Sequence, residues 1–252
     1  MIFLKSSNEL QAMDRANHLV HRTLRSVKAA ALLGVSTAEL DELAEETILK
    51  HGGTPAFKGY RGFPATLCTS VNDVIVHGIP DRATVLADGD IISVDCGVRL
   101  DGFYGDAAIT FGVGEVNNGA QKLIDTTRRC LEDAVSAVGP GKRLGDIGAA
   151  VQVRAETNGF GVVREFVGHG IGRSLHEDPQ VPNYGMAGHG QVMKPGLVIA
   201  IEPMITGGGW RVRIDKDGWT ARTEDAKLAA HFEFSVAVTE DGRRVLGVNG
   251  EK

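Results

Sequence analysis

Residues 89–111 read GDIISVDCGVRLDGFYGDAAITF, and this stretch decides the fold. Its two arms, 91–98 and 103–111, are rich in the β-branched and aromatic residues that favour strands. Asp101-Gly102 between them is a hairpin signal, because a two-residue turn that matches the twist of paired strands needs residues that tolerate a positive φ. The stretch therefore predicts two antiparallel strands joined by a tight turn.

The beginning of this hairpin occurs a second time in the chain. Residues 89–95, GDIISVD, are matched 107 positions later by GLVIAIE at 196–202, with glycine on glycine, aliphatic on aliphatic and aspartate on glutamate. The tripeptide His-Gly-Ile also occurs twice, beginning at His77 and at His169. Together these matches indicate two related parts of about 100 residues each.

Two helices are expected ahead of the strands in each part. Capping boxes at Ser6-x-x-Glu9 and Ser36-x-x-Glu39 predict the first two, which are expected to run to Gly34 and His51. Apolar spacing and breaker residues predict further helices over 121–138 and 144–157, and strands over 67–76, 162–167, 198–204 and 231–238. The strands cluster instead of alternating with helices, so the class is α+β.

A single domain over 1–252 is expected, because no Pro/Ser-rich linker separates the two parts. We interpret it as two halves related by a pseudo-two-fold axis, about 1–113 and 118–252. The net charge of −5 and the absence of long Lys/Arg runs predict no nucleic-acid partner. Three cysteines without a CxxC pair indicate a reducing compartment, and no apolar run approaches the roughly 20 residues of a membrane span. The sequence thus predicts a cytoplasmic protein with no membrane partner.

Four acids lie in otherwise apolar, strand-like segments. They are Asp95, Asp106, Glu202 and Glu233. A carboxylate in such a segment is costly unless it is paired or binds a metal. The turn at 101–102 brings Asp106 within about two residues of facing Asp95, and a bulge would make them direct neighbours. For one acid alone, a basic partner or exposure at a sheet edge explains the pattern equally well.

His169 adds a nitrogen ligand between two glycines, where the backbone can approach a ligand closely. Four carboxylates and a neutral imidazole carry about −4, which two divalent cations would neutralise and one would not. Such a pair can bridge a water, lower its pKa and clamp a carbonyl oxygen, which is hydrolytic chemistry. The oxygen-rich set suits Mn²⁺, Fe²⁺ or Co²⁺, with Zn²⁺ also possible. The remaining histidines outside these motifs are interpreted as ordinary core or surface residues: His18, His21, His51, His189 and His231.

Seven segments of the chain, between about residues 60 and 240, resemble type I methionine aminopeptidases in order and spacing. They are 70–80, 94–97, 105–106, 168–172, 176–177, 201–204 and Glu233. The resemblance implies the pita-bread fold, an antiparallel curved sheet covered by helices. It also implies release of N-terminal methionine from nascent proteins and peptides by two metal ions, with a small second residue preferred.

The resemblance also implies individual roles. Asp95, Asp106, His169, Glu202 and Glu233 would bind the two ions, with Asp106 and Glu233 as bridges and Glu202 also as general base. His77 and His176 would contact the scissile amide and steady the carbonyl oxygen or leaving amine. A methionine pocket is expected from Phe57, Tyr60, Phe63, Cys68, Leu175 and Trp219. Among these, Phe57, Phe63 and Leu175 depart from the usual residues and leave the stringency for methionine open.

Two other functions compete with this one. A proline-specific peptidase of the same fold would use the same ligands, although such relatives usually carry an extra N-terminal domain. A metal-free binding module would have lost ligands that are all retained here. Nascent polypeptides or peptide N-termini are the expected partners, and the expected state is a monomer.

Overall fold

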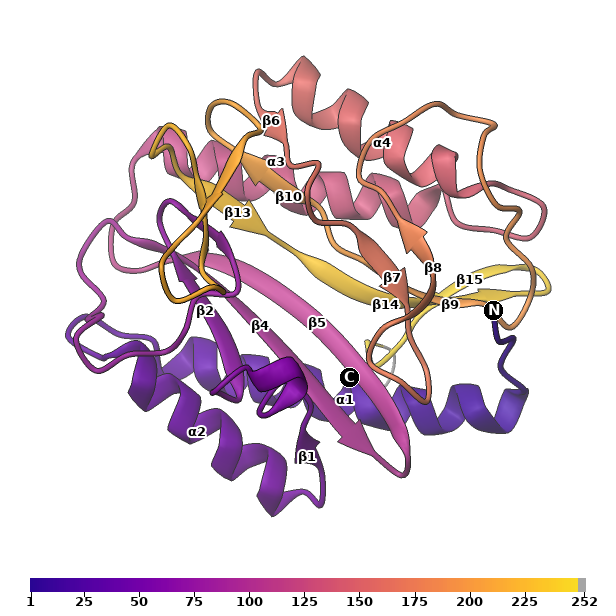
Figure 1. Cartoon of the computed structure of the whole chain (residues 1–252), viewed down its shortest axis with the longest axis horizontal. Helices are drawn as coiled ribbons and strands as arrows, with labels where there is room; N and C mark the ends of the chain where they lie inside the picture. Colours follow the sequence, from indigo (N-terminus) through magenta and orange to yellow (C-terminus); the bar gives the residue numbers. More distant parts are fainter. Residues whose placement is uncertain (249–252) are drawn as a thin grey trace.

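Four helices are arranged as two pairs in the computed structural model, which describes residues 1–248 (Figure 1). They are α1 (Ser7–Ala30), α2 (Thr37–Lys50), α3 (Asn118–Ser136) and α4 (Leu144–Thr157). Ser6 and Ser36 cap α1 and α2 with both hydrogen bonds of a capping box, as predicted. The first helix ends at Ala30, four residues before the expected Gly34. Over residues 1–248 no helix combines the length and apolarity needed to cross a bilayer.

The strands form one nine-stranded sheet and two three-stranded sheets, and every pairing is antiparallel. The large sheet has the order β1-β4-β5-β14-β9-β7-β8, with β2 beside β4 and β15 beside β14. Its strands are β1 (Thr54–Pro55), β2 (Leu67–Val71), β4 (Ile91–Leu100), β5 (Phe103–Gly112), β7 (Gly168–Gly170), β8 (Glu177–Val181), β9 (Val198–Ile201), β14 (Glu233–Thr239) and β15 (Gly242–Val245).

The small sheets have the orders β13-β10-β6 and β11-β12-β3. Their strands are β3 (Val74–Val76), β6 (Gly161–Val162), β10 (Met204–Thr206), β11 (Val212–Ile214), β12 (Ala221–Thr223) and β13 (Ala229–His231). A 3-10 helix, η1 (Tyr60–Gly62), precedes β2. The α+β class with an antiparallel sheet and helical cover is therefore confirmed.

The hairpin β4–β5 has the predicted turn. Asp101 and Gly102 both have positive φ, 52° and 81°, as a tight turn between twisted strands requires. The register continues without a bulge from Leu100↔Phe103 to Ile91↔Gly112. Asp106 opposes Gly97, so it lies diagonally two residues from Asp95. The alternative in which a bulge makes the two acids direct neighbours is wrong.

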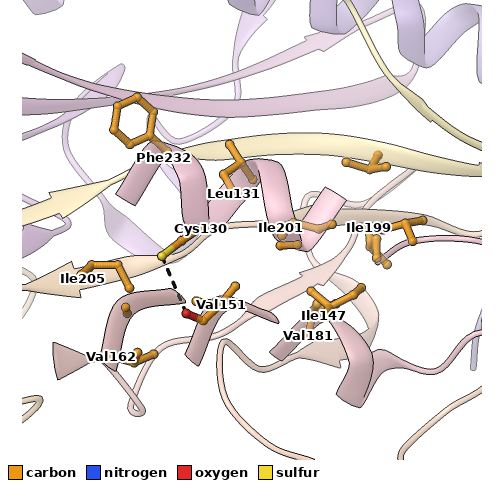
Figure 2. Packing of buried hydrophobic residues seen from close by; sticks show 14 of the residues in the cluster. Cys130, Leu131, Ile147, Val151, Val162, Val181, Ile199, Ile201, Ile205 and Phe232 are labelled. Carbon is orange, nitrogen blue, oxygen red and sulfur yellow. Dashed lines mark hydrogen bonds between the residues drawn. The ribbon is translucent and has the colours of Figure 1, made fainter. Parts of the chain in front are cut away.

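One face of the large sheet packs on the helices and the other carries the polar residues. On β4, Ile92, Val94 and Cys96 belong to a buried cluster with α1 and α2, while Asp95 lies between them on the opposite face. On β9, Ile199 and Ile201 pack against α3 and α4 (Figure 2). Alternation therefore keeps the face opposite the helices free for a functional site.

Four predicted strands are shorter or broken. The expected strand 67–76 is interrupted at Asn72, whose φ of 55° turns the chain. The expected strands 198–204 and 231–238 break at Pro203 and Phe232. At Pro203 the chain leaves the large sheet for a small one, and at Phe232 it passes from that small sheet into the large one. Pro203 has no N–H to continue the ladder, which explains the first of these breaks. Of the expected strand 162–167, only Val162 lies in a strand, as the second residue of β6, which pairs with β10. The N–H of Val163 still donates to the carbonyl oxygen of Met204.

Two isolated bridges bear on the proposed halves. Ser36 pairs with Val85 and Arg143 pairs with Val192, so the second bridge repeats the first at an offset of 107 residues. The offset equals that of the sequence repeat. The single domain with halves at about 1–113 and 118–252 stays a prediction, and this coincidence of register supports it.

Candidate metal centre

Three acids converge because of the strand register. Asp95 on β4 and Glu233 on β14 both oppose Ala108, which lies between them on β5. Asp106 lies two residues from Ala108 and so on the same face. Neighbouring strands are about 4.8 Å apart, which brings these carboxylates within reach of a shared ion.

The other two candidate ligands come from β9 and β7. Glu202 directly follows β9, and His169 on β7 opposes Ala200 of that strand. His169 Nε2 lies 3.7 Å from Glu202 Oε1. Ligand atoms of Asp106, His169 and Glu233 lie within 4.8 Å of one another. The structure thus brings together all five residues predicted as ligands.

The donor atoms fit a divalent cation. Asp95 Oδ1, Asp106 Oδ1 and Glu233 Oε1 are buried without a hydrogen-bond partner, and within residues 1–248 no lysine or arginine forms an ion pair with these acids. His169 Nδ1 lies 2.8 Å from the carbonyl oxygen of Gly170 and donates to it, which leaves the Nε2 lone pair toward the acids. Buried carboxylate oxygens without hydrogen-bond partners, next to an imidazole nitrogen with a free lone pair, form the arrangement that a metal centre requires.

The electrostatics of the cluster without a cation are unfavourable. Burial raises the pKa of Asp106, Glu202 and Glu233 well above the usual range, and neighbouring carboxylates raise each of them further. Burial also raises the pKa of Asp95 to about 7. Burial lowers the pKa of His169 to about 3, with a smaller contribution from His176. The acids therefore hold protons that a cation would displace.

A cavity of about 160 Å³ lies above the acids. Besides the five candidate ligands, its lining includes every residue predicted for substrate: Phe57, Tyr60, Phe63, Cys68, His77, Leu175, His176 and Trp219. Phe57 lies against Gly97, where a Cβ would come within 2.5 Å of the Phe57 ring. The glycine opposite Asp106 therefore makes room for this phenylalanine in the wall.

The two non-ligand histidines lie on this cavity from different segments. His77 has a φ of 60° and packs edge-on against Phe166 and Trp219. His176 Nδ1 lies 2.9 Å from the Tyr60 hydroxyl, and its ring centroid is 4.2 Å from that of His169. Burial lowers the pKa of His77 to about 4 and also lowers that of His176. Both rings are therefore neutral at pH 7 and can donate one N–H each.

A buried ion pair holds the segment that carries Leu175 and His176. Lys5 Nζ lies 2.5 Å from Glu177 Oε2, and the two side chains are 5% and 8% exposed. Glu177 Oε1 also accepts hydrogen bonds from the backbone N–H groups of Arg173 and Ser174. Because a buried charge is costly to leave unpaired, the segment 172–177 is fixed against the N-terminal residues.

Sequence reasoning missed two residues near the site. His231 was interpreted as an ordinary core residue, yet its Nε2 lies 3.7 Å from Glu202 Oε2 and has no hydrogen-bond partner. Its position two residues before Glu233 was a usable signal, because alternation favours the same face. Arg61 also lines the cavity, and nothing in its local sequence pattern indicated this.

A curved antiparallel sheet presenting carboxylates and an imidazole below a mostly apolar cavity defines a metal-dependent hydrolase of the pita-bread type. Residues 11–240 match the family model described as metallopeptidase family M24, and the chain belongs to this family.

Relatives with established names are similar over nearly the whole chain. The methionine aminopeptidase of Clostridium perfringens is 49% identical over 98% of each chain, and methionine aminopeptidase 1 of Bacillus subtilis is 46% identical over 98% of this chain and 99% of its own. The crystal structure of methionine aminopeptidase from Thermotoga maritima matches with a TM-score of 0.96 and 44% identity, covering 98% of this chain and 99% of that one. Prolidase from Pyrococcus furiosus, at 21% identity and a TM-score of 0.77, shares the fold.

Proposed function

We propose that the protein is a metal-dependent aminopeptidase that removes N-terminal methionine from nascent proteins and peptides, with a small second residue preferred. The observation that carries the proposal is the convergence of five ligand residues beneath a cavity sized for a single side chain. Relatives named methionine aminopeptidase at 46–49% identity support the same function.

Asp95, Asp106, His169, Glu202 and Glu233 would hold two divalent ions. Mn²⁺, Fe²⁺, Co²⁺ and Zn²⁺ are compatible with these ligands. When bound, the ions supply an activated water and polarise the scissile carbonyl. Four carboxylates against one neutral imidazole support a pair of ions, since one would leave about two negative charges uncompensated.

The chain's own residues supply proton transfer and orientation. Glu202 would act as general base, and burial together with the charges of Asp95 and Asp106 raises its pKa, which makes it a stronger base than an exposed glutamate. His77 and His176 are neutral and would donate N–H groups to the substrate amide and carbonyl. The buried aromatic wall excludes water and accepts an unbranched apolar side chain.

The partners and location follow from the same proposal. The substrates are peptide or nascent-chain N-termini, and the protein acts as a cytoplasmic monomer that binds neither nucleic acid nor membranes. The net charge of −5 supports the lack of a nucleic-acid partner. Three free buried cysteines support a reducing compartment.

Cleavage of matched peptides tests the proposed function. With Mn²⁺ or Co²⁺, we expect Met-Ala peptides to be hydrolysed and x-Pro peptides to remain intact. Within a series that varies only the first residue, kcat/KM for methionine should exceed that for leucine and norleucine by about 5- to 150-fold, because an apolar pocket discriminates by only about 1–3 kcal/mol. Faster x-Pro cleavage would indicate a proline-specific peptidase instead. Purified protein that takes up no metal and cleaves nothing would indicate a binding module.

A further inference from the structure

A second cavity continues from the candidate metal centre. It has a volume of about 550 Å³ and shares Arg61, His169 and His176 with the first cavity. Ser174, Gln180 and Phe3 are among the residues of its outer wall. The first cavity has room for one side chain, so a bound peptide would leave the site along this second cavity. Arg61 lies where the two meet.

The acids of the second cavity are already neutralised within the protein. Glu177 pairs with Lys5, and Asp178 pairs with the α-ammonium group of Met1. Arg61 differs, because no carboxylate of residues 1–248 forms an ion pair with it and its guanidinium lies 5.4 Å from the centre of the Tyr60 ring. The peptide path therefore carries one uncompensated positive charge at its entrance.

Arg61 has an unusual backbone conformation and an exposed side chain at the site. Its φ of 50° lies in the left-handed region, which a non-glycine residue adopts at a cost. Its side chain is exposed. Arg61 lines both cavities together with His176, so its charge lies in the same site as a residue proposed to contact the reacting bond.

We propose that Arg61 selects substrates with a carboxylate within the first few residues after the cleaved bond. The carboxylate can be an acidic side chain or the C-terminus of a short peptide. This inference rests on the proposed aminopeptidase function. A guanidinium binds a carboxylate through two parallel hydrogen bonds, whereas the protein as a whole, at −5, repels acidic peptides. Any preference for acidic substrates must therefore come from a local cation.

A peptide series measures this preference. The peptides are Met-Ala-X-Gly-Gly-Gly amides with X as Glu, Gln or Lys, and Glu is then moved one position at a time along the glycines. We expect kcat/KM for Glu to exceed that for Gln by about threefold, with Lys lower by a similar factor, as for ion pairs at an exposed rim. Met-Ala-Gly as free acid and as amide measures the contribution of a C-terminal carboxylate. Raising the salt concentration to about 1 M should bring every ratio of kcat/KM values closer to one, because salt screens exposed charges.

Two charge variants and one control assign the effect to Arg61. In Arg61→Gln, kcat/KM should be about equal for the Glu and Lys peptides. In Arg61→Glu, the Lys peptide should have the higher kcat/KM. Arg211→Gln is the matched control, because Arg211 is an exposed arginine lying 5.9 Å from the Trp210 ring and lines neither cavity. The control should keep the wild-type ratio.

The outcomes separate the two proposals. Equal cleavage of the Glu, Gln and Lys peptides by an active enzyme would contradict the role of Arg61 and leave the proposed function intact. A preference that survives in Arg61→Glu would contradict it as well. An enzyme that cleaves no Met-Ala peptide with any metal would overturn both.

Discussion

Asp106→Asn is expected to lower kcat/KM for a Met-Ala peptide by at least about 1000-fold, equivalent to about 4 kcal/mol of transition-state stabilisation. Asp106 is 3% exposed and is one of three residues whose ligand atoms lie within 4.8 Å of one another. An amide of the same shape removes one negative charge and one anionic oxygen from the residues that would hold the ions. Packing is preserved, so the loss reports on metal chemistry. The measurement is steady-state kinetics together with metal analysis of the purified variant.

Asp101→Asn is the matched control on the same hairpin. Asp101 pairs with Arg15 at the surface, with both side chains more than half exposed, and asparagine tolerates its φ of 52°. We expect this variant to retain wild-type activity within about twofold. Retention of a tenth or more of wild-type turnover by Asp106→Asn would contradict the role of Asp106 as a metal ligand.

Asp95→Asn is expected to change stability in opposite directions with and without metal. Burial raises the pKa of Asp95 to about 7 in the folded chain, against about 4 when unfolded. Between these values the folded state binds more protons than the unfolded state, so the contribution of Asp95 to stability is present below pH 4 and is lost as pH rises to 7. From pH 5.5 to 8, this loss amounts to about 2 kcal/mol of the free energy of unfolding.

The comparison removes the titration of Asp95 and, because the charge of Asp95 raises the pKa of Asp106, Glu202 and Glu233, it also weakens theirs in the same direction. In chelator, the unfolding free energy of Asp95→Asn relative to wild type should therefore rise by at least about 2 kcal/mol between pH 5.5 and pH 8. With saturating Mn²⁺ at pH 8 the order should reverse, because the variant has lost a ligand and binds the ion less tightly. Urea unfolding of wild type and variant at both pH values, in chelator and with Mn²⁺, gives these free energies of unfolding. The same pH trend with and without Mn²⁺ would show that Asp95 does not respond to metal.

Local signals in the sequence predicted the parts of the fold that depend on neighbours in the chain. The Asp101-Gly102 turn set the register of β4 and β5, and with it the diagonal placement of Asp95 and Asp106. The serine capping boxes gave the beginnings of α1 and α2. These features were accessible because turn and cap chemistry acts over two to four residues.

The pairing of strands that lie far apart in the sequence was harder to predict. β7 and β8 lie in a segment rich in glycine, proline and charged residues, and they are strands because β9 pairs with β7 and β7 with β8. The break at Phe232 depends on where two sheets meet, whereas Pro203 is a local signal for the end of β9, because proline has no N–H for the ladder. Arg61 reaches the cavity through the fold of η1, which no periodicity reveals. The roles assigned to individual site residues stay predictions until variants are measured.

The central claim is that acids from both proposed halves of the chain coexist in one site by binding divalent cations. Calorimetric titration of chelator-treated protein with Mn²⁺ at pH 6.5, in two buffers of different ionisation enthalpy, tests it most directly. The account predicts up to two ions per chain and a net release of protons, because Asp95 and its neighbours are protonated before the ions bind. Binding of no ion, or binding without proton release and undiminished in Asp106→Asn, would contradict it.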